Sequence, residues 1–232
     1  RYYHLVLLAE NNQGYANLMK IVSKRFVEGF YYKPRVDLQL LEKYHEGLIA
    51  LSACLAGEVA RFLTRGMYED AKAAALRYQD IFGKGNFFLE LQDHGIPEQQ
   101  NVNQQLLKMH RETGIELVAT NDVHYTLAED AQPHDVLLCL QTGKKLSDEN
   151  RMRYDGGQYY VKSPEEMERL FPYATEALEN THKIAQRCHV EIEFGVTKLP
   201  KFDVPQGYTS WEYLNELCFK GLEERYQPVT EE

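Results

Sequence analysis

The stretch Ile115-Glu116-Leu117-Val118-Ala119-Thr120-Asn121-Asp122-Val123-His124-Tyr125 joins an apolar run to an Asp-x-His motif. The run predicts a buried β-strand over residues 115–120. Because residues two apart in an extended chain point to the same side, Asp122 and His124 would project together from the end of that strand. A carboxylate oxygen beside an imidazole nitrogen suits zinc, manganese or iron. A single Asp-x-His motif is nevertheless a weak signal, and Asp122 could simply cap the next segment.

Three more apolar runs precede this stretch. They predict buried strands over residues 3–9, 47–53 and 86–91, the first of them parallel to its neighbours. Helical patterns alternate with the strands, supported by Asp37 as an N-cap, alanine-rich sequence after residue 70 and Pro97 at a first helical position. These helices are expected over residues 15–25, 38–44, 57–64, 67–82 and 97–112. The alternation of strands and helices predicts an α/β fold with a mostly parallel sheet or barrel.

The remainder of the chain is mainly helical in pattern. Ser163-Pro164-Glu165-Glu166 predicts a helix start, with serine as the cap and proline in the first turn. A Pro-containing connector over residues 199–208 precedes the last helix. The further elements expected here are a short strand over residues 159–162 and helices over 128–140, 174–188 and 211–226.

Reactive side chains coincide with the predicted strands. Cys54, Asp93-His94 and the pair Asp122/His124 follow strand ends, whereas His4 lies nearer the start of its strand. Parallel strands with right-handed crossovers bring their carboxyl ends to one rim, which favours a shared metal site. The alternatives are ordinary: a histidine in a strand is commonly a satisfied core residue, and a cysteine is commonly a small buried hydrophobe.

An aromatic and basic segment, Phe30-Tyr31-Tyr32-Lys33-Pro34-Arg35, is expected to be a loop because Pro34 keeps Lys33 out of the helical region. Arginine matches the geometry of phosphate oxygens, so Lys33 and Arg35, together with His94, are candidate contacts to phosphate or nucleic acid. The alternative is a solvated loop whose tyrosines pack on the domain.

Composition sets broad limits on function. The 232 residues are 44% hydrophobic and 26% charged, with a net charge of −9, which disfavours a free-standing nucleic-acid-binding domain. Four cysteines without a CxxC pair indicate a reduced, cytoplasmic protein without a zinc knuckle. No apolar run has the length of a membrane span. The chain opens on an apolar strand without methionine, so we expect a fragment of a longer protein.

Several segments together resemble the PHP (polymerase and histidinol phosphatase) domain of bacterial replicative C-family DNA polymerases, the polymerase III α subunits. The resemblance covers essentially the whole chain, with the segments in the family's order. They are His4-Leu5-Val6-Leu7-Leu8-Ala9, Gly29-Phe30-Tyr31-Tyr32-Lys33-Pro34-Arg35, Leu48-Ile49-Ala50-Leu51-Ser52-Ala53-Cys54-Leu55-Ala56-Gly57-Glu58, Leu89-Glu90-Leu91-Gln92-Asp93-His94-Gly95, Ala119-Thr120-Asn121-Asp122-Val123-His124-Tyr125 and Ser163-Pro164-Glu165-Glu166-Met167.

The resemblance implies a partial, distorted (β/α)7 barrel that lacks its first strands and is followed by C-terminal helices. The PHP domain would occupy residues 1–198, and residues 199–232 would form a connector and helix leading toward the polymerase palm. By similarity His4, Cys54, Asp122 and His124 are the later ligands of a Zn or Mn cluster. The family's earlier ligands, including an HxH pair, have no counterpart here, so we expect an incomplete site and an inactive fragment.

The resemblance also implies a DNA-directed DNA polymerase (a nucleotidyltransferase) of DNA replication as the parent protein. Its catalytic aspartates and their Mg would lie outside this chain. Its PHP domain would be a metal-dependent phosphoesterase, such as a 3′–5′ exonuclease. The alternative is a non-catalytic scaffold that docks a separate proofreading exonuclease. Expected partners are DNA, deoxynucleotides and other replicase subunits, with no membrane.

Overall fold

The structure is a computed structural model that describes residues 2–226. It divides into two compact units, Arg1–Glu191 and Ile192–Glu232. The second unit holds a connector and helix α9 (Ser210–Arg225), whose start is fixed by a capping box between Thr209 and Glu212. The domain boundary after residue 198 stays a prediction, and residues 227–232 of the predicted C-terminal segment lie outside the described residues.

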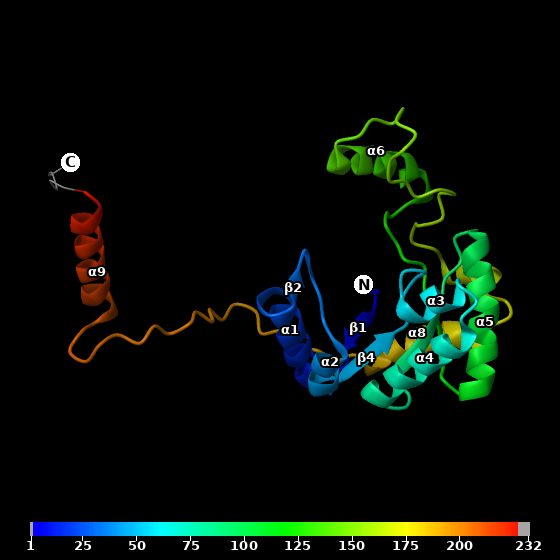
Figure 1. The fold of residues 1–232 in the computed structure, drawn as a ribbon, viewed down its shortest axis with the longest axis horizontal. Helices are drawn as coiled ribbons and strands as arrows, with labels where there is room; N and C mark the ends of the chain where they lie inside the picture. Colours follow the sequence, from blue (N-terminus) through cyan, green and yellow to red (C-terminus); the bar gives the residue numbers. More distant parts are fainter. Residues whose placement is uncertain (1, 227–232) are drawn as a thin grey trace. The chain divides into compact units, whose positions relative to one another are not determined.

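A four-stranded sheet forms the centre of the first unit, with the strand order β1-β4-β5-β6 (Figure 1). The pairs β4–β5 and β5–β6 are parallel. The first unit is therefore a mixed α/β structure built on an open sheet. The strands are β1 (Val6–Ala9), β4 (Leu48–Leu51), β5 (Phe87–Leu91) and β6 (Leu117–Ala119).

The prediction of a buried, parallel first strand was wrong. β1 pairs antiparallel with β4, with Val6 opposite Leu51 and Ala9 opposite Leu48, and it is only half-buried at the edge of the described sheet. An apolar run indicates burial but carries no information on direction, which the connection decides. Here the connection contains two helices and a hairpin before the chain re-enters the sheet.

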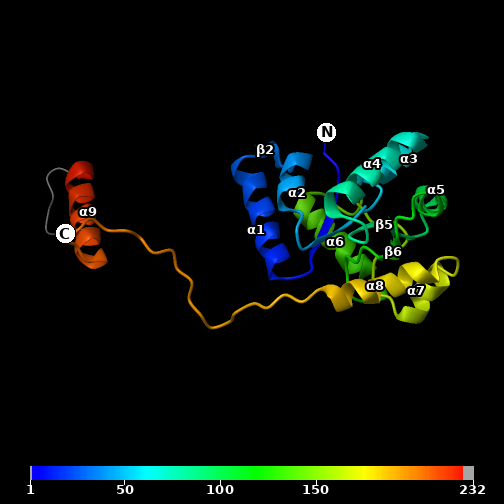
Figure 2. The same cartoon turned by 90° about the horizontal axis from the view of Figure 1, so that it is seen from below.

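Side chains alternate between the two faces of the sheet. On β4, Leu48 and Ala50 join the main hydrophobic core with helices α1 to α5, while Ile49 and Leu51 join a smaller cluster with Ile184 of α8. Figure 2 shows α8 running beside the sheet. The helices of this unit are α1 (Asn12–Val27), α2 (Leu38–Tyr44), α3 (Glu58–Leu63), α4 (Tyr68–Phe82), α5 (Pro97–Thr113), η1 (Ala128–Asp130), α6 (Ala131–Thr142), α7 (Pro164–Leu170) and α8 (Thr175–Arg187).

Local signals placed most helix ends correctly. Asp37 caps α2 by accepting a hydrogen bond from Leu40 N at 2.8 Å, and Pro97 opens α5. Ser163 caps α7 in a reciprocal box with Glu166. These expectations are confirmed. No helix among the described residues is both long and apolar enough to cross a lipid bilayer.

Two local expectations were wrong. The segment expected to be a loop is a small hairpin of β2 (Phe30–Tyr31) and β3 (Lys33–Pro34), where Pro34 is tolerated because a two-stranded ribbon has open edges. The strand expected over 159–162 is reduced to an isolated bridge between Tyr125 and Tyr160. A longer ladder cannot form because the chain turns into η1 directly after Tyr125 and Thr126.

Candidate functional site

His4 and Cys54 are in direct contact. His4 precedes β1 and forms an isolated parallel bridge with Gly57, its backbone N–H donating to Ala56 O at 3.1 Å. Cys54 follows β4, and its Sγ lies 3.5 Å from His4 Nδ1. The imidazole is exposed and the thiol is half-buried. Of the four predicted metal ligands, His4 and Cys54 are thus in contact with each other.

A tight turn after β4 holds the thiol in place. Ala53 has φ +63°, a left-handed conformation that costs free energy in a residue with a Cβ atom. Gly57 N donates to Cys54 O at 2.8 Å, and a Cβ added at Gly57 would lie 2.2 Å from Ser52 O. The turn is thus closed around the backbone of Cys54, with no room for a side chain at residue 57.

Asp122 and His124 follow β6, as predicted. Asp122 is exposed and has φ +43°, so strained backbone occurs at this strand end as well. His124 Nδ1 lies 2.7 Å from Asp122 O, which makes Nδ1 the hydrogen-bond donor to the carbonyl oxygen. That tautomer leaves the Nε2 lone pair available for a ligand. The ring packs on Tyr154 at 4.2 Å between centroids.

Electrostatics connect the two strand ends. Burial raises the pKa of the Cys54 thiol, and the negative charges of Asp122 and Glu90 raise it further. Burial and the charge of Asp122 also raise the pKa of Tyr154 and of Tyr159. The charge of Asp122 therefore acts on the Cys54 thiol, although no hydrogen bond between the two groups is present among the described residues.

His4 Nδ1 and Cys54 Sγ are atoms of the kind that bind transition-metal ions, but two ligands are fewer than such an ion needs. Zn–S and Zn–N bonds of about 2.3 and 2.0 Å at a tetrahedral angle separate the two ligand atoms by roughly 3.5 Å, and His4 Nδ1 lies 3.5 Å from Cys54 Sγ. Among residues 2–226, however, no three His, Cys, Asp or Glu side chains converge as a set that could hold a metal. A complete site would need further ligands or a shift of Asp122 and His124 toward the pair.

Sequence reasoning missed Glu90, which is buried beneath these strand ends. Its Oε2 accepts from Ala53 N at 2.9 Å, and its Oε1 accepts from Thr120 Oγ1 at 2.5 Å and from Gln92 Nε2 at 3.1 Å. One carboxylate thus ties the strained turn before Cys54 to the end of β6, two residues before Asp122. Burial raises the pKa of Glu90, which these donors partly oppose. A glutamate inside the apolar run Phe87–Leu91 was the available signal.

His134 was also left without a role by the sequence. It lies on α6, and its ring centroid is 5.9 Å from that of His124 and 5.3 Å from that of Tyr154. Nothing in its local sequence distinguishes it from other helical histidines, because its contacts with His124 and Tyr154 depend on the tertiary path of the chain. His134 adds a second imidazole to the aromatic group around His124.

We predict that Glu90→Leu lowers the free energy of unfolding by about 2–5 kcal/mol, because three donors lose their buried acceptor. Glu90→Gln should cost less, since its amide oxygen still accepts from Ala53 N. Its amide nitrogen can donate to Gln92 Oε1, which is buried without a partner in the described structure, once the Gln92 amide turns over from its present orientation with Nε2 toward residue 90. Urea unfolding of the two variants checks this. Equal losses in both would show that the acceptor role of Glu90 is not what matters.

His94 is buried and bonded through both ring nitrogens. Its Nε2 lies 2.8 Å from Asn121 O, and Gln99 Nε2 lies 2.9 Å from its Nδ1. Tyr159 stacks on the ring at 4.0 Å. In this arrangement no ring nitrogen is free for a phosphate, and the side chain instead fixes Asn121, the residue before Asp122.

The basic residues Lys33, in β3, and Arg35, directly after it, lie beside the N-terminal segment that leads to His4. Lys33 Nζ and the Arg35 guanidinium are 5.5 and 5.4 Å from the ring centroid of Tyr2, two residues before His4. Arg35 also covers the ring of Tyr31 at 5.3 Å. Of the predicted phosphate contacts, Lys33 and Arg35 therefore both lie against the ring of Tyr2. His94 is instead buried, with both ring nitrogens hydrogen-bonded.

Comparisons with known proteins show which proteins the chain is similar to. The PHP domain family matches residues 1–94. The DNA polymerase III subunit alpha of Treponema pallidum is 46% identical over 233 aligned residues, which cover 100% of this chain and 20% of that protein. The corresponding subunits of Borreliella burgdorferi and Thermus aquaticus are 47% and 44% identical, over 98% and 97% of this chain and 20% and 19% of theirs.

The chain thus spans about a fifth of the length of these relatives. Its identity to each of them extends over nearly all of its residues, well beyond the segment matched by the PHP family. The chain is therefore homologous, over essentially its full length, to the PHP-containing region of bacterial DNA polymerase III α subunits.

Proposed function

We propose that this chain is the PHP region of a replicative DNA-directed DNA polymerase and that this region is a metal-dependent phosphoesterase, acting as a 3′–5′ exonuclease. The observation that carries the proposal is the His4–Cys54 contact at 3.5 Å, with the charge of Asp122 acting on the same thiol. Thiolate, imidazole and carboxylate are all ligands of Zn, carboxylate also suits Mn, and the His4–Cys54 contact brings an imidazole and a thiol together.

His4, Cys54, Asp122 and His124 would hold the metal, with the missing ligands supplied by the part of the polymerase that completes the barrel. A bound divalent metal would supply an activated water and stabilise charge on the phosphate. The chain's own contribution is positional: Glu90 fixes the turn before Cys54, and the Nδ1–H bond of His124 to Asp122 O directs Nε2 outward.

Lys33 and Arg35 would contact phosphates of the nucleic acid, since both cations are held on aromatic rings at the edge of the unit. For His94 we propose a positioning role through Asn121 in place of direct contact. Polymerisation itself, with its aspartates and Mg, would take place outside this chain. As part of a replicase the protein would work in the cytoplasm with DNA, deoxynucleotides and the other replicase subunits.

A second candidate function is a non-catalytic scaffold that docks a separate proofreading exonuclease. The observation that favours it is the lack of a three-ligand cluster among the described His, Cys, Asp and Glu side chains. The scaffold would keep the Glu90 network for stability alone, and its ligand-like residues would have no metal to hold.

Metal removal distinguishes the two. With the complete gene product, dialysis against a chelator should abolish nucleotide release from the 3′ end of a single-stranded oligonucleotide, and added Mn or Zn should restore it. Cys54→Ser should lower the bound metal at least roughly tenfold, whereas Cys218→Ser, at an exposed cysteine of α9, should not. Hydrolysis that resists the chelator would contradict the phosphoesterase, and unchanged metal in Cys54→Ser would contradict the site.

A further inference from the structure

The hairpin of β2 and β3 presents three aromatic side chains to solvent. Phe30, Tyr31 and Tyr32 are 58%, 65% and 83% exposed. Figure 1 shows β2 next to the end of α1, at the edge of the first unit. Large apolar rings are rarely left this open at adjacent positions unless they contact something outside the chain.

The tip of the hairpin is strained. Tyr32 lies between paired residues Tyr31 and Lys33 and has φ +58°, a conformation that glycine adopts freely but that costs free energy in tyrosine. Its ring makes an edge contact with Tyr31 at 4.7 Å, yet remains mostly in water. The tyrosine therefore contributes little packing in return for its strain, which points to a role in binding.

Three cations lie on aromatic rings in or next to the hairpin, and one of them, Arg35, lies over Tyr31 of the hairpin itself at 5.3 Å. Arg25 lies over Phe26 at 4.9 Å, and Lys33 and Arg35 lie over Tyr2. None of the three forms a salt bridge among the residues that the structure describes. The Nε atoms of Arg25 and Arg35 are buried without a hydrogen-bond partner in the same range.

The acidic side chains nearby are already engaged. Glu28 pairs with Lys24, and Asp37 caps α2 through Leu40 N. The hairpin thus carries unpaired positive charge and open rings on a chain whose net charge is −9. Local positive charge on an acidic protein is the complement of a polyanion.

We propose that this hairpin binds single-stranded nucleic acid, with bases stacked on Tyr32 and Phe30 and phosphates on Lys33, Arg35 and Arg25. Stacking needs unpaired bases, which a duplex does not offer, and open aromatic rings beside cations are the usual means of holding a single strand. The proposal builds on the phosphate contact proposed for Lys33 and Arg35, but it needs no metal, so it can hold or fail independently of the phosphoesterase.

The experiment uses the complete gene product in excess chelator and a single-stranded oligonucleotide carrying 5-iodouracil. Ultraviolet cross-linking followed by peptide mass spectrometry should place an adduct on Tyr32 or Phe30, and the matched duplex should give none. Mapping the adduct separates this hairpin from any other nucleic-acid contact of the protein. Protection of residues 26–35 by another polypeptide, with no adduct there, would overturn the proposal in favour of a protein-docking surface.

Tyr32→Gly is the decisive variant because glycine suits φ +58°, so the fold should melt as in the wild type. The adduct in residues 26–35 should fall roughly 5- to 100-fold. Phe194→Gly, at a ring that is 86% exposed in the second unit, is the aromatic control and should change nothing. Persistence of the full adduct in a well-folded Tyr32→Gly protein would refute the stacking role.

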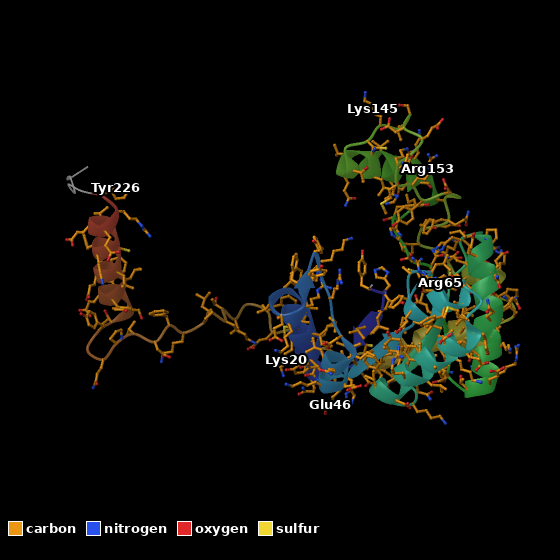
Figure 3. All side chains as sticks on the ribbon, in the orientation of Figure 1. Lys20, Glu46, Arg65, Lys145, Arg153 and Tyr226 are labelled. Atoms are coloured by element: carbon orange, nitrogen blue, oxygen red, sulfur yellow. The ribbon has the colours of Figure 1, made fainter. Side chains whose placement is uncertain are left out.

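Charge is tested separately. Lys33→Ala and Arg35→Ala should each weaken formation of the hairpin adduct. Each should also reduce the slope of the logarithm of binding against the logarithm of salt concentration by roughly 0.7, the value expected for the loss of one phosphate contact. Lys145→Ala is the charge control, because Figure 3 shows Lys145 at the end of the α6 segment and not on the hairpin. An unchanged salt slope in both hairpin variants would rule out phosphate contact by these residues.

Discussion

Replacing Asp122 with asparagine in the complete gene product is expected to reduce the phosphoesterase activity by at least about a hundredfold while leaving nucleotide incorporation unchanged. Asparagine keeps the shape of aspartate but loses the charge that holds a divalent cation, and loss even of an outer partner of a ligand costs about 10- to 100-fold. Under the proposed function, incorporation would depend on carboxylates elsewhere in the polymerase. Exonuclease turnover, primer extension and bound metal should be measured on the same preparations.

In metal-free protein, the Asp122→Asn variant also tests whether the charge of Asp122 acts on Cys54. Because the charge of Asp122 raises the pKa of Cys54, its removal should lower that pKa and speed alkylation of Cys54 at neutral pH. Cys218, exposed on α9, serves as the internal reference in each digest. Thermal melting should be unchanged, since Asp122 is exposed.

Two results would count against this assignment. If exonuclease activity and bound metal persist in a well-folded Asp122→Asn protein, Asp122 is not a ligand. If there is no phosphoesterase activity to lose and the variant differs only in binding a proofreading partner, the scaffold is the correct function.

Much of the fold could be predicted from local pattern. The apolar runs at Leu48–Leu51, Phe87–Leu91 and Leu117–Ala119 are strands, and Pro97, Asp37 and Ser163 mark helix starts, because caps and buried runs depend on neighbouring residues. The direction of β1 could not be predicted, since it depends on the path of the chain through α1, the hairpin and α2. The residue pattern also did not predict that the short run after Gln158 would form only an isolated β-bridge, between Tyr125 and Tyr160, instead of a strand.

The site was predictable only as a set of strand-end residues. The sequence placed His4 near the start of a strand expected to be parallel, which would separate it from Cys54. The antiparallel pairing of β1 with β4 instead brings His4 Nδ1 to 3.5 Å from Cys54 Sγ. The roles of Glu90 and His94 were hidden because both act through tertiary hydrogen bonds, to Ala53 N and Asn121 O. From the sequence, the Asp93-His94 pair after a strand suggests an exposed binding site. In the structure His94 is buried and Gln99 contacts its Nδ1, so its role is structural.

The second large effect is expected at Gly57, whose missing Cβ allows the turn that brings His4 to Cys54. Its φ is −67°, which any residue can adopt, so a substitution there is opposed by crowding alone. The added Cβ of alanine would lie 2.2 Å from Ser52 O and 3.1 Å from Cys54 O, both backbone atoms that cannot rotate away. Gly57→Ala should therefore lower the free energy of unfolding by about 3 kcal/mol.

The clash must also open the turn that carries the thiol. His4 N bonds to Ala56 O and His4 pairs with Gly57, so movement of residues 52–57 should separate His4 from Cys54 and expose Sγ. Less burial lowers the pKa of Cys54, and its alkylation should become faster than in the wild type.

Gly221→Ala is the control, because the nearest atom to its added Cβ is the flexible end of Arg225 at 3.9 Å. This variant should leave Cys54 alkylation unchanged, and its free energy of unfolding should be unchanged or slightly higher because alanine favours helix α9. A Gly57→Ala protein as stable as the wild type would show that the turn is not closely packed, and a destabilised one with unaltered Cys54 reactivity would show that the turn does not place the thiol.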